Sequence, residues 1–356
     1  MTIVAKFEIE YLRFLDPEGH RVGELPEFAS DRGALIELYR WMVIARTFDE
    51  KAIALQRTGR LGTFASSQGQ EAVSIGLAHA MAESDVLLPS FREHGAQILR
   101  GVSPKELFMY WGGDERGSAF AGPREDFPVS IPVGSHAAHA VGAALAFKLR
   151  REARAAVAVF GDGATSKGDV YEAMNVAGAW TLPVVFIVTN NQWAISVRRA
   201  AQTAAETLAQ KAIASGFEGV QVDGNDVIAV REIVGRSLDK ARNGGGPTLV
   251  EALTYRLADH TTADDASRYR DEEEVATHWK EEPVSRLRAH LTAEHGWTRD
   301  EEAQLIESCQ REIVSAVEEY LAEAPQSPTA MFDHLHAQFP AALTAQRDSL
   351  LREGDS

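Results

Sequence analysis

Two short polar motifs in the middle of the sequence suit the binding of a phosphorylated ligand through a hard cation. The first is Gly161-Asp162-Gly163, and the second is Asn190-Asn191, whose second residue lies 29 positions after Asp162. A hard cation takes oxygen ligands at about 2.1 Å, usually a carboxylate, an amide oxygen, a backbone carbonyl and the phosphates themselves. Asp162 and Asn191 offer the first two of these ligand types.

Each motif alone is typical of ordinary structure, because Gly-Asp-Gly is most often a turn and Asn-Asn after a strand is usually a loop cap. Their spacing adds information. It matches one strand-helix-strand crossover, so parallel neighbouring strands would bring the two motifs together. The glycines beside Asp162 let the backbone approach a diphosphate, and a helix expected from near Gly168 offers amide groups and its positive dipole end.

The elements that must position these motifs follow from the apolar pattern. Strands are expected at 86–88, 155–160, 183–189, 220–222 and 248–255. Helices are expected at 31–60, 69–81, 137–150, 169–179, 203–215 and 226–243, a loop at 112–132, and further helices through 272–353 with breaks near Gly296 and Pro325 to Pro328. Buried strands alternating with helices predict an α/β fold with a doubly wound parallel sheet. Both polar motifs fall at carboxyl ends of strands, where such sheets bind ligands.

The segment from Gly161 to Ser196 resembles the thiamine diphosphate fingerprint, which is Gly-Asp-Gly, 26 intervening residues and Asn-Asn. From about Gly59 to the C-terminal helices the chain is similar to the alpha subunits of the E1 component of pyruvate and branched-chain 2-oxo acid dehydrogenase complexes. The resemblance implies the thiamine-diphosphate-binding fold. It divides the chain into an N-terminal extension and helix (1–60), a diphosphate-side binding domain (61–270) and a C-terminal helical extension (271–356).

The resemblance also implies site residues. Asp162, Asn191 and the backbone carbonyl of Trp193, where the family often has tyrosine, are expected to bind Mg²⁺. In the segment Ser90 to Gly95, Arg92 is expected to contact the diphosphate, whereas Phe91 replaces a family tyrosine and lacks its hydroxyl donor. Val133 is expected to offer main-chain groups to the aminopyrimidine. The complete set of expected cofactor-binding residues is Arg92, Val133, Asp162, Gly163, Ala164, Asn191, Trp193 and His260.

His260 lies in a polar segment, 255–270, that is similar to the family loop carrying the active-site histidine. A histidine titrates near neutrality and can donate to a phosphate or to a developing oxyanion, so His260 is the expected catalytic residue. Arg256, Asp264 and Tyr269 match residues that order this loop. Thr261 stands where mitochondrial relatives carry a regulatory phosphoserine, but phosphorylation of Thr261 or Ser267 does not follow from the sequence.

The activity implied is thiamine-diphosphate-dependent oxidative decarboxylation of a 2-oxo acid, followed by reductive acylation of a lipoyl group on E2. This is oxidoreductase chemistry on an oxo group with a disulfide acceptor. The glutamate that activates the aminopyrimidine requires a second module of about 150 to 200 residues. We therefore expect it from an E1 beta subunit in an alpha2-beta2 assembly, which two-fold symmetry favours.

Substrate and class alternatives remain open at this point. The Arg92-x-His94-Gly95 pattern favours pyruvate, whereas the small residues of 62–71, expected to form the pocket wall, would admit a branched-chain 2-oxo acid. One methylene changes binding by only about 1 to 3 kcal/mol. The alternatives are the alpha subunit of an acetoin dehydrogenase and a non-catalytic binding protein that keeps the fold.

Charge, hydropathy and cysteine content limit the classes of partner and the cellular location that we expect. The chain has 36 Lys and Arg against 52 Asp and Glu, giving a net charge of −16 without a basic stripe, so no nucleic-acid partner is expected. No apolar run reaches the roughly 20 residues of a membrane span. The single cysteine, Cys309, cannot form an intramolecular disulfide, and residues 1–15 resemble neither a secretory signal nor a transit peptide. We expect a cytoplasmic bacterial or archaeal protein.

Overall fold

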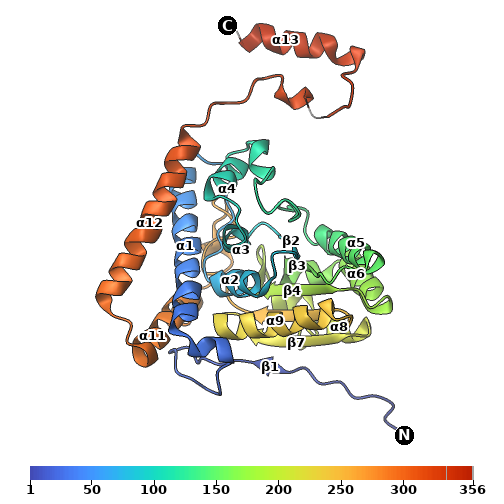
Figure 1. Cartoon of the computed structure of the whole chain (residues 1–356), viewed down its shortest axis with the longest axis vertical. Coiled ribbons are helices and arrows are strands. Elements are labelled where there is room, and N and C mark those ends of the chain that lie inside the picture. The colour runs from blue at the N-terminus through green and yellow to red at the C-terminus, as the bar shows by residue number, and fades with distance from the viewer. Residues whose placement is uncertain (334, 355–356) are drawn as a thin grey trace.

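One sheet of six strands forms the centre of the computed structural model, which describes residues 1–333 and 335–354. All neighbouring strands are parallel, in the order β1-β7-β8-β4-β3-β2 (Figure 1). The strands are β1 (Tyr11–Leu12), β2 (Val86–Leu88), β3 (Ala156–Gly161), β4 (Val184–Asn190), β7 (Glu218–Asp223) and β8 (Thr248–Leu253), with a separate hairpin of β5 (Trp193–Ala194) and β6 (Val197–Arg198). The predicted α/β fold with a doubly wound parallel sheet is confirmed.

Helices cover both faces of this sheet. Successive side chains of β3 alternate between two buried apolar clusters: Val157 and Val159 join one, and Ala158 and Phe160 join the other. The first cluster is completed by α2 (Glu71–Ala80) and α9 (Val227–Arg242), the second by α5 (Ser135–Arg150) and α6 (Gly168–Ala179). Strand β3 is therefore built from apolar residues up to its closing Gly161, as a strand covered on both faces must be.

Strand register places the two polar motifs at one edge. Gly161, the last residue of β3, pairs with Thr189 of β4, and Asn190, the last residue of β4, pairs with Leu253 of β8. The Gly-Asp-Gly turn and the Asn-Asn pair therefore leave neighbouring strands in the same direction. The chain after β8 continues alongside, because Arg256 N donates to the Asn191 carbonyl at 3.3 Å.

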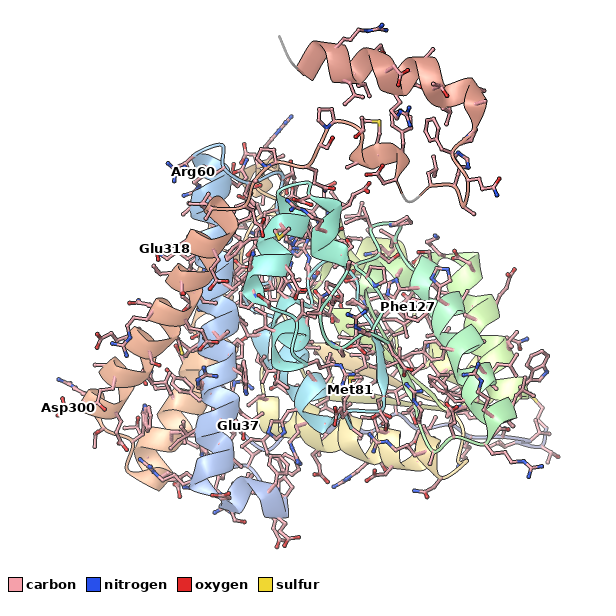
Figure 2. The ribbon with its side chains drawn as sticks, turned by 45° about the horizontal axis from the view of Figure 1, so that its top comes forward. Glu37, Arg60, Met81, Phe127, Asp300 and Glu318 are labelled. Carbon is pink, nitrogen blue, oxygen red and sulfur yellow. The ribbon has the colours of Figure 1, made fainter. Side chains whose placement is uncertain are left out.

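The N-terminal and C-terminal helices pack against each other beside the sheet domain. Figure 2 shows α12 (Arg299–Leu321), marked by Asp300 and Glu318, beside α1 (Arg32–Arg57), marked by Glu37. Arg32 of α1 pairs with Glu301 of α12 at 2.7 Å. The remaining helices are α3 (His94–Leu99), α4 (Pro104–Trp111), α7 (Arg199–Gln202), α8 (Lys211–Ala214), α10 (Glu272–Trp279), α11 (Pro283–His295) and α13 (Thr344–Gly354), the last lying away from the sheet (Figure 1).

Some local predictions are wrong. The helix expected at 203–215 forms only over its end, as α8. Residues 203–210 are irregular, because the backbone amides of Leu208 and Ala209 donate to the buried carboxylate of Glu251 at 2.8 and 2.9 Å. Strand β1 was not predicted from the sequence. It is fixed by Asp226, the N-cap of α9, which accepts from the amides of Phe14 and Leu15 at 2.7 Å each.

The division into 1–60, 61–270 and 271–356 stays a prediction, and residues 334, 355 and 356 of its last part lie outside the described residues. Of the helices within the described ranges, none combines the length and apolar character needed to span a membrane.

Candidate cofactor-binding site

A cavity of about 220 Å³ lies at the carboxyl edge of the sheet, where β3 and β4 end. All eight residues expected to bind the cofactor line it, namely Arg92, Val133, Asp162, Gly163, Ala164, Asn191, Trp193 and His260. They come from segments far apart in the sequence, so the fold brings together what the motifs only suggested.

Asp162 begins the short 3₁₀ helix η3 (Asp162–Ser166) directly after β3, and only 2% of the residue is exposed. Its Oδ2 accepts a hydrogen bond from Gln202 Nε2 at 2.8 Å. Among the described residues, no cationic side chain lies within ion-pair distance of this carboxylate. Burial raises its pKa. A buried carboxylate without a paired cation is unfavourable on its own and favours a bound positive ion.

Asn191 has a defined orientation. The Trp193 backbone N–H donates to the side-chain oxygen Oδ1 at 3.2 Å, which identifies that atom because a backbone N–H can only donate. Asn191 Nδ2 then donates to Gln70 Oε1 at 3.0 Å. The Trp193 carbonyl accepts from Arg256 Nη1 at 3.4 Å. A carboxylate, an amide oxygen and a backbone carbonyl are thus available together, which is the donor set that suits a hard cation.

The backbone at Gly161 leaves room for a ligand. A Cβ atom added there would meet nothing within 4 Å, whereas one added to Gly163 would lie 2.7 Å from the Cβ of Ala194. The expectation that the N-terminus of α6 at Gly168 faces the ligand is wrong. The turn of η3 separates that helix from the cavity, and the backbone bordering the cavity belongs to 161–164.

Arg92 is buried in the turn before α3, and its Nη2 donates to His260 Nδ1 at 3.0 Å and to the His260 carbonyl at 2.8 Å. Burial and the nearby Arg256 lower the pKa of Arg92 to about 10, so it stays charged at neutral pH. Phe91 stands edge-to-face against the His260 ring at a centroid distance of 6.1 Å. Phe91, which lacks the hydroxyl donor of the family tyrosine, therefore contributes an apolar contact to the His260 ring.

His260 is neutral at physiological pH, so the expectation that it titrates near neutrality is wrong. Burial, then the charges of Arg92 and Arg256, lower its pKa to about 4. Because an arginine can only donate, His260 Nδ1 is the acceptor, and the ring proton is on Nε2. His260 lines the cavity, so it offers a neutral N–H donor to a bound group.

Hydrogen bonds hold the loop that carries His260. The His260 amide donates to Asp264 Oδ2 at 3.0 Å, and Tyr269 donates its hydroxyl proton to the same carboxylate. Arg256 Nη2 donates to the Tyr269 hydroxyl at 2.9 Å. The three residues expected to order the loop are therefore connected to one another. The loop is also tied to the preceding segment, since the Thr262 amide donates to the Phe64 carbonyl at 2.8 Å.

Other predictions for the pocket are met only in part. Of residues 62–71, only Gln70 lines the cavity, while Phe64 is fully buried against the His94 ring, so this segment does not form a pocket wall. Val133 lines the cavity, but its carbonyl already accepts from Lys167 Nζ at 2.7 Å. Gln70 and Gln202 were missed. The only sequence signal for Gln70 was its position at the start of an apolar helix, and Gln202, just before the helix expected at 203–215, carried no signal.

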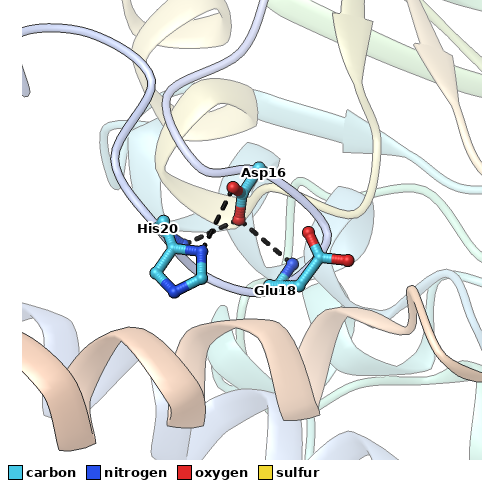
Figure 3. A group of neighbouring side chains, drawn as sticks. All are labelled: Asp16, Glu18 and His20. Carbon is cyan, nitrogen blue, oxygen red and sulfur yellow. Dashed lines mark hydrogen bonds and ion pairs between the residues drawn. The ribbon is translucent and has the colours of Figure 1, made fainter.

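A second group of closely spaced ionisable side chains lies in the turn after β1 (Figure 3). Asp16, Glu18 and His20 approach one another there. Asp16 Oδ1 accepts from the backbone amides of Glu18 and His20 at 3.1 and 2.8 Å, and the Glu18 and His20 side chains are exposed. This pattern is that of an Asx turn, which accounts for the group without a ligand.

Comparisons with known proteins identify the family of the chain. The model of the family described as "Dehydrogenase E1 component" matches residues 39–331. The chain is 38% identical over 353 residues to the 3-methyl-2-oxobutanoate dehydrogenase subunit alpha of Mycobacterium tuberculosis, covering 97% of this chain and 95% of that protein. It is 37% identical over 345 residues to the pyruvate dehydrogenase E1 component subunit alpha of Staphylococcus aureus, covering 96% and 92%. The chain belongs to the dehydrogenase E1 component family.

Proposed function

We propose that this chain is the alpha subunit of a thiamine-diphosphate-dependent E1 component that oxidatively decarboxylates a 2-oxo acid and acylates lipoyl groups of E2. The E1 dehydrogenase family depends on thiamine diphosphate, and relatives named as alpha subunits match nearly the whole chain. The observation that carries the proposal is one cavity at the sheet edge, lined by all eight residues expected to bind the cofactor.

In this proposal Mg²⁺ is bound by Asp162, Asn191 and the carbonyl of Trp193. The unpaired buried carboxylate of Asp162 and the oriented oxygen of Asn191 support this assignment. Arg92 and the backbone of 163–164 bind the diphosphate, and the open space beside Gly161 allows its close approach. Val133 offers its backbone N–H to the aminopyrimidine. When bound, thiamine diphosphate supplies the nucleophilic carbon and the electron sink for decarboxylation.

His260 acts as a neutral hydrogen-bond donor. Arg92 donates a hydrogen bond to Nδ1 and so keeps the ring in the tautomer that carries its proton on Nε2. From that atom His260 can donate to the substrate carbonyl oxygen or to a cofactor phosphate, and stabilise charge that develops on the acceptor. Because its pKa is lowered to about 4, the ring is uncharged at neutral pH and Nε2 carries its single proton.

The partners follow from the same assignment. A beta subunit contributes the glutamate that activates the aminopyrimidine, and the functional unit is an alpha2-beta2 tetramer whose product is collected by lipoylated E2. The single cysteine, Cys309, is compatible with the reducing conditions of the cytoplasm, where we place the enzyme.

The test is decarboxylation of pyruvate and of 2-oxoisovalerate in parallel, with thiamine diphosphate and Mg²⁺, by this chain alone, by a candidate beta chain alone, and by their mixture. Activity only in the mixture, in a complex whose mass fits alpha2-beta2, is the expected result. The preferred substrate then identifies the complex. Sequence identity does not choose between the two substrates, because a relative named for 3-methyl-2-oxobutanoate matches at 38% and one named for pyruvate at 37%. Full activity of this chain alone would overturn the two-subunit assignment, and activity only toward acetoin would replace the substrate class.

A further inference from the structure

Two glutamines each hold one of the side chains assigned to Mg²⁺. Gln202, at the end of α7, donates from Nε2 to Asp162 Oδ2 at 2.8 Å. Gln70, directly before α2, accepts from Asn191 Nδ2 at 3.0 Å. The two glutamines come from segments more than a hundred residues apart, yet both approach the same three-oxygen donor set.

The contact of Gln202 fixes the orientation of the Asp162 carboxylate. Its amide donates to Asp162 Oδ2 and leaves other lone pairs of the carboxylate for a cation. The short helix that carries Gln202 is fixed at its start by Arg199, whose Nη2 donates to the Glu206 carbonyl at 2.7 Å. Gln202 therefore acts on Asp162 from a defined position.

The contact of Gln70 satisfies the other end of the Asn191 amide. Since the Trp193 N–H requires Oδ1 on its side, the opposite Nδ2 must find an acceptor, and Gln70 Oε1 is that acceptor. Only 3% of Gln70 is exposed, and its Nε2 has no hydrogen-bond partner among the described residues. A buried amide donor without a partner is destabilising. Gln70 nevertheless stays buried, and its hydrogen bond to Asn191 explains this position.

We propose that Gln70 and Gln202 are positioning residues that pre-orient Asn191 and Asp162 for Mg²⁺. The inference rests on the proposed function, in which those two side chains bind the metal. Mg²⁺ requires nearly ideal octahedral geometry, whereas Ca²⁺ accepts irregular oxygen shells. Residues that hydrogen-bond to metal ligands typically change metal affinity by about 10-fold to 100-fold when removed. Loss of either glutamine should therefore weaken Mg²⁺ more than Ca²⁺.

The experiment uses the assembled alpha-beta enzyme, freed of metal and cofactor. Mg²⁺ and, separately, Ca²⁺ are titrated at fixed thiamine diphosphate, and cofactor binding is followed by quenching of tryptophan fluorescence, with Trp193 lining the cavity. The variants are Gln70→Met and Gln202→Met, which remove the amides at similar length. The matched control is Gln326→Met, because Gln326 Nε2 donates to Asp114 Oδ1 at 2.7 Å at an exposed place that does not line the cavity.

We expect the Mg²⁺ midpoint to rise about 10-fold or more in both test variants, the Ca²⁺ midpoint to rise less, and Gln326→Met to match the wild type. Gln70→Glu, which keeps an acceptor for Asn191, should retain the preference for Mg²⁺ over Ca²⁺. Unchanged Mg²⁺ midpoints, or equal weakening of both ions, would overturn the positioning role. If the wild-type assembly does not bind thiamine diphosphate with either ion, the proposed function fails instead, so the two failures are distinguishable.

Discussion

Arg92 and His260, 168 positions apart in the chain, are joined by two hydrogen bonds from one guanidinium nitrogen, to the ring Nδ1 at 3.0 Å and to the His260 carbonyl at 2.8 Å. The side chain assigned to the diphosphate therefore also sets the tautomer of the histidine assigned to catalysis. Any movement of Arg92 toward a phosphate changes the environment of His260, so cofactor binding and the donor strength of His260 are coupled.

Replacing His260 separates turnover from cofactor binding. His260→Ala should lower kcat of the assembled enzyme by about 10²-fold to 10⁴-fold, the range for a positioned proton or hydrogen-bond donor. Thiamine diphosphate affinity should fall much less than kcat, because Arg92 and the metal ligands remain. The measurement is kcat with lipoylated E2 together with the cofactor dissociation constant. His278→Ala, a histidine that does not line the cavity, is the control, and an unchanged kcat in His260→Ala would contradict the catalytic role.

Asp162→Asn should improve stability while removing function. Burial raises the pKa of Asp162 above 3.8, so at pH 7 the ionised carboxylate is less favourable in the folded chain than in the unfolded chain. This cost decreases as the pH falls through the raised pKa and is gone below 3.8. Without metal and cofactor, the variant should therefore unfold at a higher temperature than the wild type at pH 7, with a smaller difference at acidic pH. Thermal unfolding at several pH values measures this effect.

The same variant should lose Mg²⁺-dependent binding of thiamine diphosphate, since a neutral amide replaces the only carboxylate of the proposed donor set. Isothermal titration with the assembled enzyme checks this loss. Tight Mg²⁺-dependent binding by Asp162→Asn would show that the metal is held elsewhere.

Two glycines of one motif should respond differently to alanine. A Cβ on Gly161 meets nothing within 4 Å, so Gly161→Ala should fold like the wild type but bind the cofactor more weakly, because the methyl group enters the open space beside the backbone. A Cβ on Gly163 would lie 2.7 Å from that of Ala194, so Gly163→Ala should also lower the thermal midpoint. Unfolding and cofactor titration of both variants test this contrast. Equal thermal midpoints would contradict it.

The sequence predicted the central strands and the meeting of Asp162 with Asn191 because both depend on local signals. Continuous apolar runs identify β3 and β4, and parallel register then fixes where the polar residues after each strand lie. Strand β1 has no such signal, because the two-residue strand Tyr11–Leu12 is placed beside β7 by the contact of Asp226 with the amides that follow it.

Properties that arise from distant contacts could not be predicted in this way. The lowered pKa of His260 depends on burial and on Arg92, which the sequence places 168 residues away. Gln70 and Gln202 acquire their roles only through contacts with Asn191 and Asp162. The irregular chain before α8 depends on its hydrogen bonds to the buried carboxylate of Glu251 in β8, 42 to 43 residues further along the chain. In each case the deciding interaction is tertiary.

A buried histidine outside the cavity predicts how the chain responds to acid. His94, at the start of α3, is fully buried; its ring packs against Phe64 and Phe48, and its Nε2 accepts from Trp111 Nε1 at 2.9 Å. Burial, with a smaller effect of Arg92, lowers its pKa from 6.5 to about 3. Between these values the unfolded chain binds a proton at this site that the folded chain does not. The contribution of His94 to the free energy of unfolding should therefore be fully present above pH 6.5 and decrease as the pH falls from 6.5 toward 3.

For this one group the loss is about 1.4 kcal/mol per pH unit. His94→Gln keeps an acceptor for Trp111 but does not titrate, so its thermal midpoint should fall less between pH 7.5 and pH 5 than that of the wild type. His136 and His290 also have pKa values lowered by burial, so the variant should reduce the acid sensitivity without removing it. Thermal unfolding of both proteins at matched pH measures the difference. Identical declines would mean that His94 takes up its proton in the folded chain as readily as in the unfolded one.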